Sequence, residues 1–183
     1  MKFLYFLRHG KAEAPQFDQE DRDRRLTSSG QRSATAMGNH ARERGFRIDV
    51  VLTSTARRTA ETTELFLAAF GQSVPVRQLT GLYLASPEEI LAHVAELDDA
   101  TDSVVIIGHN PGLSELAIML VASGPAPARS LLARGFPTAA LAEIAVDAAS
   151  WRQVAPGRGR LVRFTRPGDL PADTAGDQEP GAA

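Results

Sequence analysis

Short apolar runs separated by segments of helical period are the feature that most constrains the fold of this 183-residue chain. The apolar runs, which we expect to form strands, lie at residues 2–7, 50–53, 74–78 and 104–107. The segments of helical period lie at residues 29–44, 55–70, 86–97 and 112–122. Such alternation is typical of βαβ units. It predicts an α/β fold, a three-layer α/β/α sandwich around a mainly parallel central sheet.

Local signals mark where two of these helices begin and end. In the segment 29–44, Ala34, Met37 and Ala41 are spaced to share one face, and Gly45 follows as a helix-ending residue. The run Ser86-Pro87-Glu88-Glu89 supplies an N-cap, a proline at the first helical position and the glutamate of a capping box. Both signals predict helices that are stable at their ends.

The last third of the chain follows a different pattern. Residues 124–127 read Gly-Pro-Ala-Pro, a loop signal, and residues 139–146 and 159–165 have the composition of strands that could pair antiparallel at the sheet edge. Residues 167–183 contain three prolines, three glycines and four acids without any basic residue, so they carry little apolar surface to bury. We therefore expect one domain over residues 1–166 and a disordered acidic tail over residues 167–183.

Charge and composition exclude several classes of function. The net charge of -2 gives no overall field for capturing nucleic acid or an anionic membrane. The basic cluster at residues 22–25 is interleaved with acids, which cancel its field. The chain has no cysteine, and its longest later apolar stretch, residues 116–122, is far shorter than the roughly 20 residues that span a bilayer. We expect a cytoplasmic protein that binds neither nucleic acid nor membrane.

Polar clusters follow three of the expected strands, each at the carboxyl end. Arg8-His9-Gly10 follows the first strand, residues 53–58 (Thr-Ser-Thr-Ala-Arg-Arg) follow the second, and Gly108-His109 follows the run 104–107. In open α/β sheets the ligand crevice lies outside these strand ends. Two histidines and at least two arginines are therefore expected to converge there, next to helix N-termini that favour an anion.

Such a group of side chains suits phosphoryl transfer. Guanidinium groups match a tetrahedral phosphoryl group with paired hydrogen bonds, and a neutral imidazole nitrogen could attack phosphorus in line. Arginine would then stabilise the charge that a metal ion stabilises elsewhere, so no metal or cofactor is implied. Spacing alone does not decide which of His9 and His109 is the nucleophile.

Each cluster also has an ordinary structural explanation when taken alone. An Arg-His-Gly tripeptide arises often by chance, and residues 108–112 could be a simple strand-to-helix turn. Arg57 and Arg58 could lie on a solvated helix face, because adjacent helical residues point about 100° apart. The two remaining histidines, His40 and His93, are best explained as surface or packing residues. The joint occurrence at three strand ends is what favours a site.

These motifs resemble the histidine phosphatase superfamily, also called phosphoglycerate mutase-like. Arg8-His9-Gly10 resembles its signature, and Gly108-His109 matches its second catalytic histidine. The stretch 54–62 resembles the family segment Ser-Pro-x-x-Arg-Ala-x-Gln-Thr, with Ser54, Arg58 and Thr62 in register. The resemblance implies a phosphoglycerate mutase-like fold, His9 as the phosphorylated nucleophile, and Arg8, Arg58 and His109 as phosphoryl-binding groups beside Gly10. Register favours Arg58 over Arg57.

Within the superfamily, the chain is most similar to the branch of small, SixA-like phosphohistidine phosphatases. Residues 23–30 resemble the Asp-Arg-Pro-Leu-Thr-x-x-Gly block of that branch, and Leu82-Tyr83 before the Ser86 helix also fits. The mutase branch continues Arg-His-Gly with Glu, where this chain has Lys11. Thr55 and Glu61 depart from the superfamily's Pro and Gln, outside the expected phosphate contacts.

No acid in the sequence stands out as the proton donor that a phosphomonoesterase needs for its leaving group. Glu88 and Glu89 are explained by capping, and Glu13 by a loop. Imidazole leaves phosphorus with less help than an alkoxide, so we expect a histidine-phosphorylated protein as substrate. Two alternatives stay open: a general phosphomonoesterase of small molecules, and a phosphate- or phosphohistidine-binding module without turnover. The oligomeric state is not readable from the sequence.

Overall fold

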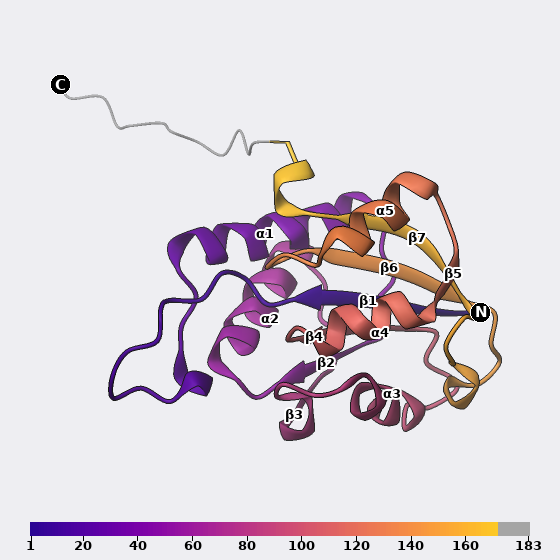
Figure 1. The fold of residues 1–183 in the computed structure, drawn as a ribbon, viewed down its shortest axis with the longest axis horizontal. Helices are drawn as coiled ribbons and strands as arrows, with labels where there is room; N and C mark the ends of the chain where they lie inside the picture. The colour runs from indigo at the N-terminus through magenta and orange to yellow at the C-terminus, as the bar shows by residue number, and fades with distance from the viewer. Residues whose placement is uncertain (172–183) are drawn as a thin grey trace.

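A seven-stranded sheet forms the centre of the computed structural model, which describes residues 1–171 (Figure 1). The strand order across the sheet is β3-β2-β4-β1-β6-β7-β5. The strands are β1 (Lys2–Arg8), β2 (Val50–Ser54), β3 (Val76–Leu79), β4 (Ser103–Gly108), β5 (Val121–Ser123), β6 (Leu141–Val146) and β7 (Gly159–Thr165).

The sheet is mainly parallel, as the sequence predicts. Strand β1 pairs parallel with β4, β2 pairs parallel with both β3 and β4, and β5 pairs parallel with β7. Only β6 runs against its neighbours β1 and β7. Every residue of β2 and β4 is buried, which explains why these strands read as continuous apolar runs rather than alternating ones.

Helices cover both faces of the sheet, so the expected three-layer sandwich is confirmed. One apolar core lies beneath α1 (Ser28–Glu43) and α2 (Arg57–Phe70), and the other lies beneath α3 (Pro87–Ala95), α4 (Gly112–Leu120) and α5 (Ala126–Arg134). Figure 1 shows α4 and β1 beside one another, with α1 and α2 on the other layer.

The helix ends agree with the local signals in the sequence. Ala34, Met37 and Ala41 are fully buried, so the predicted face of α1 is the packed face. Gly45, the predicted helix-ending residue, follows the C-cap of α1 in the left-handed conformation, at φ 67°. Ser86 and Glu89 form the reciprocal capping box at the start of α3.

Two elements differ from the sequence prediction. Residues 126–134 form helix α5, although the neighbouring prolines indicate a loop, because proline fits the first turn of a helix, where its missing N–H costs nothing. The late strands are antiparallel as expected, but β6 lies inside the sheet between β1 and β7, and the unpredicted β5 takes the edge. Strand β5 has three residues, too few to show a period.

The C-terminal segment is partly described. Residues 167–169, which the sequence places in the tail, form a short 3-10 helix, η4 (Pro167–Asp169), in which Arg166 pairs with Asp169 at 2.6 Å. The rest of the expected tail, residues 172–183, lies outside the described residues. Over residues 1–171, no helix has the length and apolar character needed to cross a bilayer.

Candidate active site

The three polar clusters meet at the carboxyl ends of the parallel strands. Arg8 ends β1 and lies opposite Gly108, which ends β4, so the two strands deliver His9 and His109 side by side. Strand β2 pairs with β4 and leads into α2, whose second residue is Arg58. The sheet topology therefore gathers residues that are a hundred positions apart in the chain.

A cavity of about 410 Å³ opens at this edge of the sheet. His9 and His109 both line it, with their ring centroids 5.3 Å apart. The residues lining the cavity are Arg8, His9, Lys11, Ala12, Asp21, Arg24, Arg58, Leu84, His109, Asn110 and Thr138. Four of the five residues expected in the site, Arg8, His9, Arg58 and His109, thus face one cavity.

His9 has one ring nitrogen fixed by the backbone. Its Nδ1 lies 2.7 Å from the carbonyl oxygen of Gly10. A carbonyl oxygen can only accept, so Nδ1 carries the proton and Nε2 keeps its lone pair. Burial, and then the nearby charges of Arg58 and Arg8, lower the pKa of His9 to about 4. The ring is therefore neutral at pH 7, with Nε2 available as a nucleophile.

His109 is also neutral and has the opposite tautomer. Its Nδ1 lies 3.3 Å from Nη2 of Arg58, which can only donate, so Nδ1 accepts and Nε2 carries the proton. That Nε2–H donates to the hydroxyl oxygen of Ser54 at 2.9 Å. Burial first, and then the charge of Arg58, lower the pKa of His109 to about 3. Both ring nitrogens thus have protein partners in this arrangement.

Arg8 is held by the loop before β6. Its Nη1 donates to the carbonyl oxygen of Phe136 at 2.9 Å, and Nδ2 of Asn110 donates to the same oxygen at 2.9 Å. The backbone N–H of Ala139 donates to the carbonyl oxygen of His9. This loop therefore supports the ends of β1 and β4 from the side opposite β2.

Arg58 is the buried member of its arginine pair. It is 3% exposed, and its guanidinium donates to the backbone oxygen of Asp21 at 2.6 Å and to the carboxylate of Asp21 at 2.9 Å. Arg57 faces solvent and pairs with Glu61 at 2.9 Å. The structure therefore places Arg58, and not Arg57, in the cavity.

Gly10 supports the site through its backbone. Its N–H donates to the hydroxyl of Thr62 at 3.0 Å, and that hydroxyl donates in turn to the carbonyl oxygen of Arg58 at 2.6 Å. The segment after β1 is thereby joined to the first turns of α2. The sequence motif places Ser54 and Thr62 in register. Each is hydrogen-bonded to a residue that lines the cavity, Ser54 to His109 and Thr62 to the backbone of Arg58.

Sequence reasoning did not find Asp21 or the hydroxyl of Tyr83. Asp21 lies in η1 (Asp21–Asp23), and its carboxylate accepts from Arg24, Arg58 and Tyr83. These donors hold the pKa of Asp21 well below its usual range. Its contact with Arg58 joins residues 37 positions apart, so no local pattern could have revealed it.

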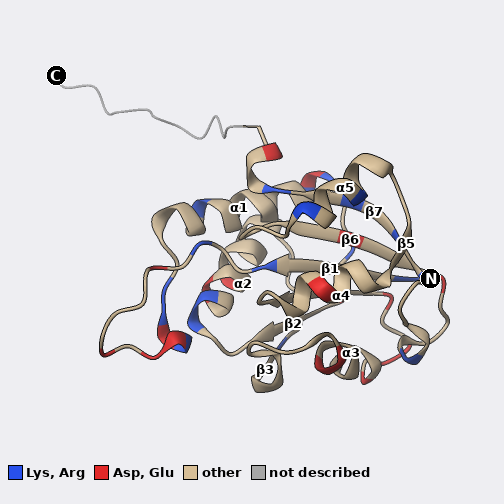
Figure 2. Ribbon diagram, viewed as in Figure 1, with Lys and Arg blue, Asp and Glu red and all other residues tan. Residues whose placement is uncertain are grey.

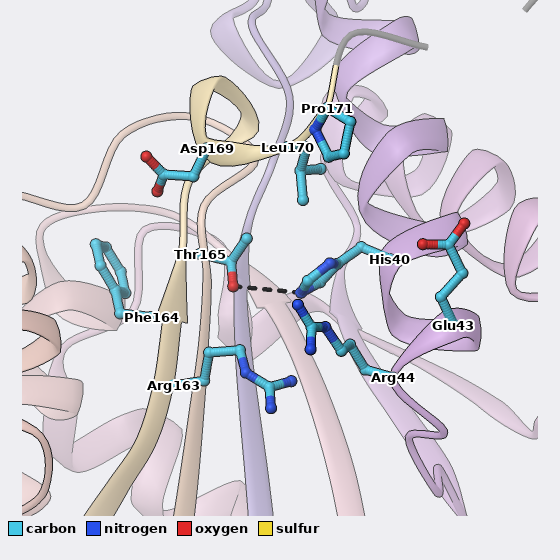
Figure 3. A pocket seen from close by; sticks show the side chains of 9 residues that line it. All are labelled: His40, Glu43, Arg44, Arg163, Phe164, Thr165, Asp169, Leu170 and Pro171. Atoms are coloured by element: carbon cyan, nitrogen blue, oxygen red, sulfur yellow. Dashed lines mark hydrogen bonds between the residues drawn. The ribbon is translucent and has the colours of Figure 1, made fainter. Parts of the chain in front are cut away.

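The other titratable candidates lie outside the cavity. Glu89 caps α3 by accepting from the N–H of Ser86, as the capping motif predicts. His40 lies in a separate pocket between α1 and β7, where the hydroxyl of Thr165 is 3.3 Å from its Nε2 (Figure 3). Over the described part of the chain, no three or more His, Cys, Asp or Glu side chains are arranged to hold a metal ion.

A family model and a known protein match this chain over much of its length. The family model of the histidine phosphatase superfamily (branch 1) matches residues 4–83. The protein Rv1276c of Mycobacterium tuberculosis is 33% identical over 163 residues, which cover 88% of this chain and 99% of that one.

Two solved structures named for the phosphohistidine phosphatase SixA match over nearly their whole length. The structure from Nakamurella multipartitia has a TM-score of 0.78 at 32% identity and covers 91% of this chain and 96% of that one. The structure from Agrobacterium tumefaciens has a TM-score of 0.74 at 29% identity, and the match covers 90% of this chain and 97% of that one. With its phosphoglycerate mutase-like sheet and paired histidines, this chain belongs to the histidine phosphatase superfamily.

Proposed function

We propose that this chain is a metal-independent phosphatase that forms a phosphohistidine intermediate on His9 and acts on histidine-phosphorylated protein. The superfamily supports phosphatase chemistry as such. The observation that carries the assignment of His9 is its tautomer: Nδ1 is committed to the carbonyl oxygen of Gly10, which leaves the Nε2 lone pair unprotonated at neutral pH. We assign the activity to residues 1–166.

The proposed reaction has two steps. In the first, Nε2 of His9 attacks phosphorus, a N–P bond forms, and the bond from phosphorus to the leaving group breaks with its electron pair going to the leaving group. Arg8 and Arg58 stabilise the negative charge on the phosphoryl oxygens, with His109 beside them. In the second step the oxygen of water attacks phosphorus, the N–P bond breaks with its electron pair returning to Nε2 of His9, and inorganic phosphate and the neutral imidazole are released.

The choice of substrate rests on Asp21, the one carboxylate among residues 1–171 that lines the cavity. Asp21 is held ionised by Tyr83, Arg24 and Arg58, so it cannot supply a proton to an alkoxide leaving group. A phosphoramidate needs less help, because its imidazole leaving group is a weaker base than an alkoxide. The names of the similar solved structures point to the same substrate class.

A second candidate function is hydrolysis of small phosphomonoesters. A broad-specificity phosphatase of Saccharomyces cerevisiae, YOR283W, is 33% identical over 82 residues, which cover 43% of this chain. This match spans less of the chain than the SixA matches do. The binding-module alternative has less support, because both histidines and both inner arginines are present around one cavity.

A substrate panel tests the proposal. The purified chain is assayed for phosphate release from a phosphohistidine peptide, p-nitrophenyl phosphate and several sugar phosphates, with the His9→Ala variant as the blank. We expect kcat/KM for the phosphohistidine peptide to exceed that for the sugar phosphates by about tenfold or more, because its leaving group needs less help from an acid. Faster hydrolysis of sugar phosphates would favour the second candidate, and binding without turnover would favour the module.

A further inference from the structure

Asp21 links a surface loop to the guanidinium of Arg58. It begins η1, in the loop over residues 11–26 that joins β1 to α1, and Figure 2 shows this loop with acidic and basic segments side by side. Nη1 of Arg58 donates to the Asp21 backbone oxygen at 2.6 Å, and Nη2 donates to its carboxylate at 2.9 Å. Two bonds to one residue fix both the position and the plane of the guanidinium.

The contact leaves part of Arg58 available. Arginine has five N–H donors, and Asp21 takes one from each terminal nitrogen. Among the described residues, no protein atom accepts from Nε of Arg58. The Arg58 side chain is 4% exposed whereas that of Asp21 is 45% exposed, so Asp21 approaches the guanidinium from the rim of the cavity.

Tyr83 and Arg24 hold the Asp21 carboxylate in turn. The hydroxyl of Tyr83 donates to Oδ2 of Asp21 at 2.7 Å, and Nη1 of Arg24 donates to Oδ1 at 2.8 Å. The Tyr83 ring also meets His109 edge-on at 5.4 Å and lies 5.9 Å from Cζ of Arg58. Asp21 is thus fixed by three donors, two of them from outside its own loop.

From this arrangement we infer that Asp21 is a positioning residue that, with Tyr83, sets the guanidinium of Arg58 for the phosphoryl group. The inference rests on the proposed function for its kinetic consequences. As a positioning residue, Asp21 acts without touching the substrate. Its two hydrogen bonds reduce the number of orientations that the Arg58 guanidinium can take before the substrate binds. Charge alone would predict the opposite role, in which the Asp21 carboxylate competes with an incoming phosphate for Arg58.

A double-mutant cycle distinguishes the two roles. The variants are Asp21→Ala, Arg58→Ala and the combination, with Asp21→Asn as an isosteric second variant. Asp23→Ala is the matched control, because it removes the same charge from the same turn and its side chain makes no hydrogen bond among the described residues. For each variant, kcat, KM, the inhibition constant of orthovanadate and the thermal midpoint are measured.

We expect Asp21→Ala to lower kcat/KM by about tenfold to a hundredfold and to weaken vanadate binding, with the thermal midpoint close to that of Asp23→Ala. Asp21→Asn keeps an acceptor oxygen and should lie between wild type and Asp21→Ala. Because Asp21 acts through Arg58, the double variant should be no worse than Arg58→Ala alone.

Three outcomes would overturn the inference: tighter vanadate binding in Asp21→Ala, losses that multiply in the double variant, or wild-type kinetics in both Asp21 variants. If the wild-type chain shows no turnover on any substrate, the proposed function fails instead. The vanadate measurements still test the link between Asp21 and Arg58 in that case.

Discussion

Arg57 and Arg58 are neighbours in the sequence, yet the fold gives them opposite surroundings. Residues that follow one another on a helix point about 100° apart, so only one of the two can face the sheet edge. Arg58 is buried against Asp21 and His109, whereas the Arg57 side chain is 44% exposed beside Glu61. The pair therefore provides a matched comparison of an inner and an outer guanidinium.

Replacing each arginine by alanine should give very different activities. Arg58→Ala removes the charged donor that the proposed function places at the phosphoryl oxygens, and should lower kcat by about a hundredfold to a thousandfold. Arg57→Ala removes an exposed ion pair with Glu61, worth about 0.3–0.5 kcal/mol, and should leave kcat within about twofold of wild type. Steady-state assays on the same substrate compare the two. Equal losses in both variants would show that Arg58 has no special place in the reaction.

Among the elements, the sequence predicted best those whose ends carry strong local signals. The capping box of Ser86 and Glu89 is where its motif indicates, and Gly45 directly follows the C-cap of α1, as predicted. Helix α5 is not predicted, because the prolines around its first turn give the same sequence pattern as a loop. A helix tolerates proline in its first turn, so the pattern does not distinguish the two. Strand β5 is not predicted, because its three residues are too few to show the alternating period of a strand.

Helix α1 begins against the segment that follows β1, and Gly30 allows this close approach. A Cβ at position 30 would fall against the backbone of Lys11, which follows His9 and Gly10 in the chain. Gly30→Ala should therefore destabilise the protein by about 1–3 kcal/mol through overpacking and should also lower kcat. Urea denaturation and steady-state assays measure the two effects.

Gly168→Ala is the control for this experiment, because nothing lies within 4 Å of a Cβ at that position. It should change stability by less than about 0.5 kcal/mol. A Gly30→Ala variant as stable and as active as Gly168→Ala would mean that α1 does not constrain the segment after β1.

On the scale of the whole molecule, the position of the site could be predicted because it follows from topology. Parallel strands present their carboxyl ends at one edge, so His9 and His109 had to meet once β1 and β4 were neighbours. The contacts of Asp21 with Arg58 and Tyr83 could not be predicted, since they depend on the path of the loop over residues 11–26. Side-chain contacts between distant loops leave no periodic trace in a sequence.

The buried histidines make the stability of the molecule depend on pH. Burial lowers the pKa of His9 to about 4 and that of His109 to about 3, whereas both take up protons near pH 6.5 when unfolded. Below about pH 6.5 the unfolded chain therefore binds more protons than the folded one, and stability falls as the pH falls. The slope is at most about 1.4 kcal/mol per pH unit for each histidine.

Urea denaturation between pH 7.5 and pH 5 (roughly the range over which histidine titrates) should show this loss in the wild-type chain. His9→Gln should have a shallower dependence, because it removes one of the three buried imidazoles, those of His9, His40 and His109. His93→Gln, whose side chain is partly buried on α3 and does not line the cavity, is the control against which the slope of His9→Gln is compared. A slope that is unchanged in His9→Gln would contradict the neutral, buried state of His9.

The most direct measurement is the identification of the phosphorylated residue during turnover. The wild-type chain is mixed with a phosphohistidine peptide, quenched in alkali to preserve phosphoramidate bonds, digested and mapped by mass spectrometry, with His9→Ala treated in parallel. We predict a phosphoryl group on His9 in the wild-type chain, and neither label nor turnover in His9→Ala, which should still bind vanadate. A label on His109 or another residue, or turnover by His9→Ala, would contradict the account.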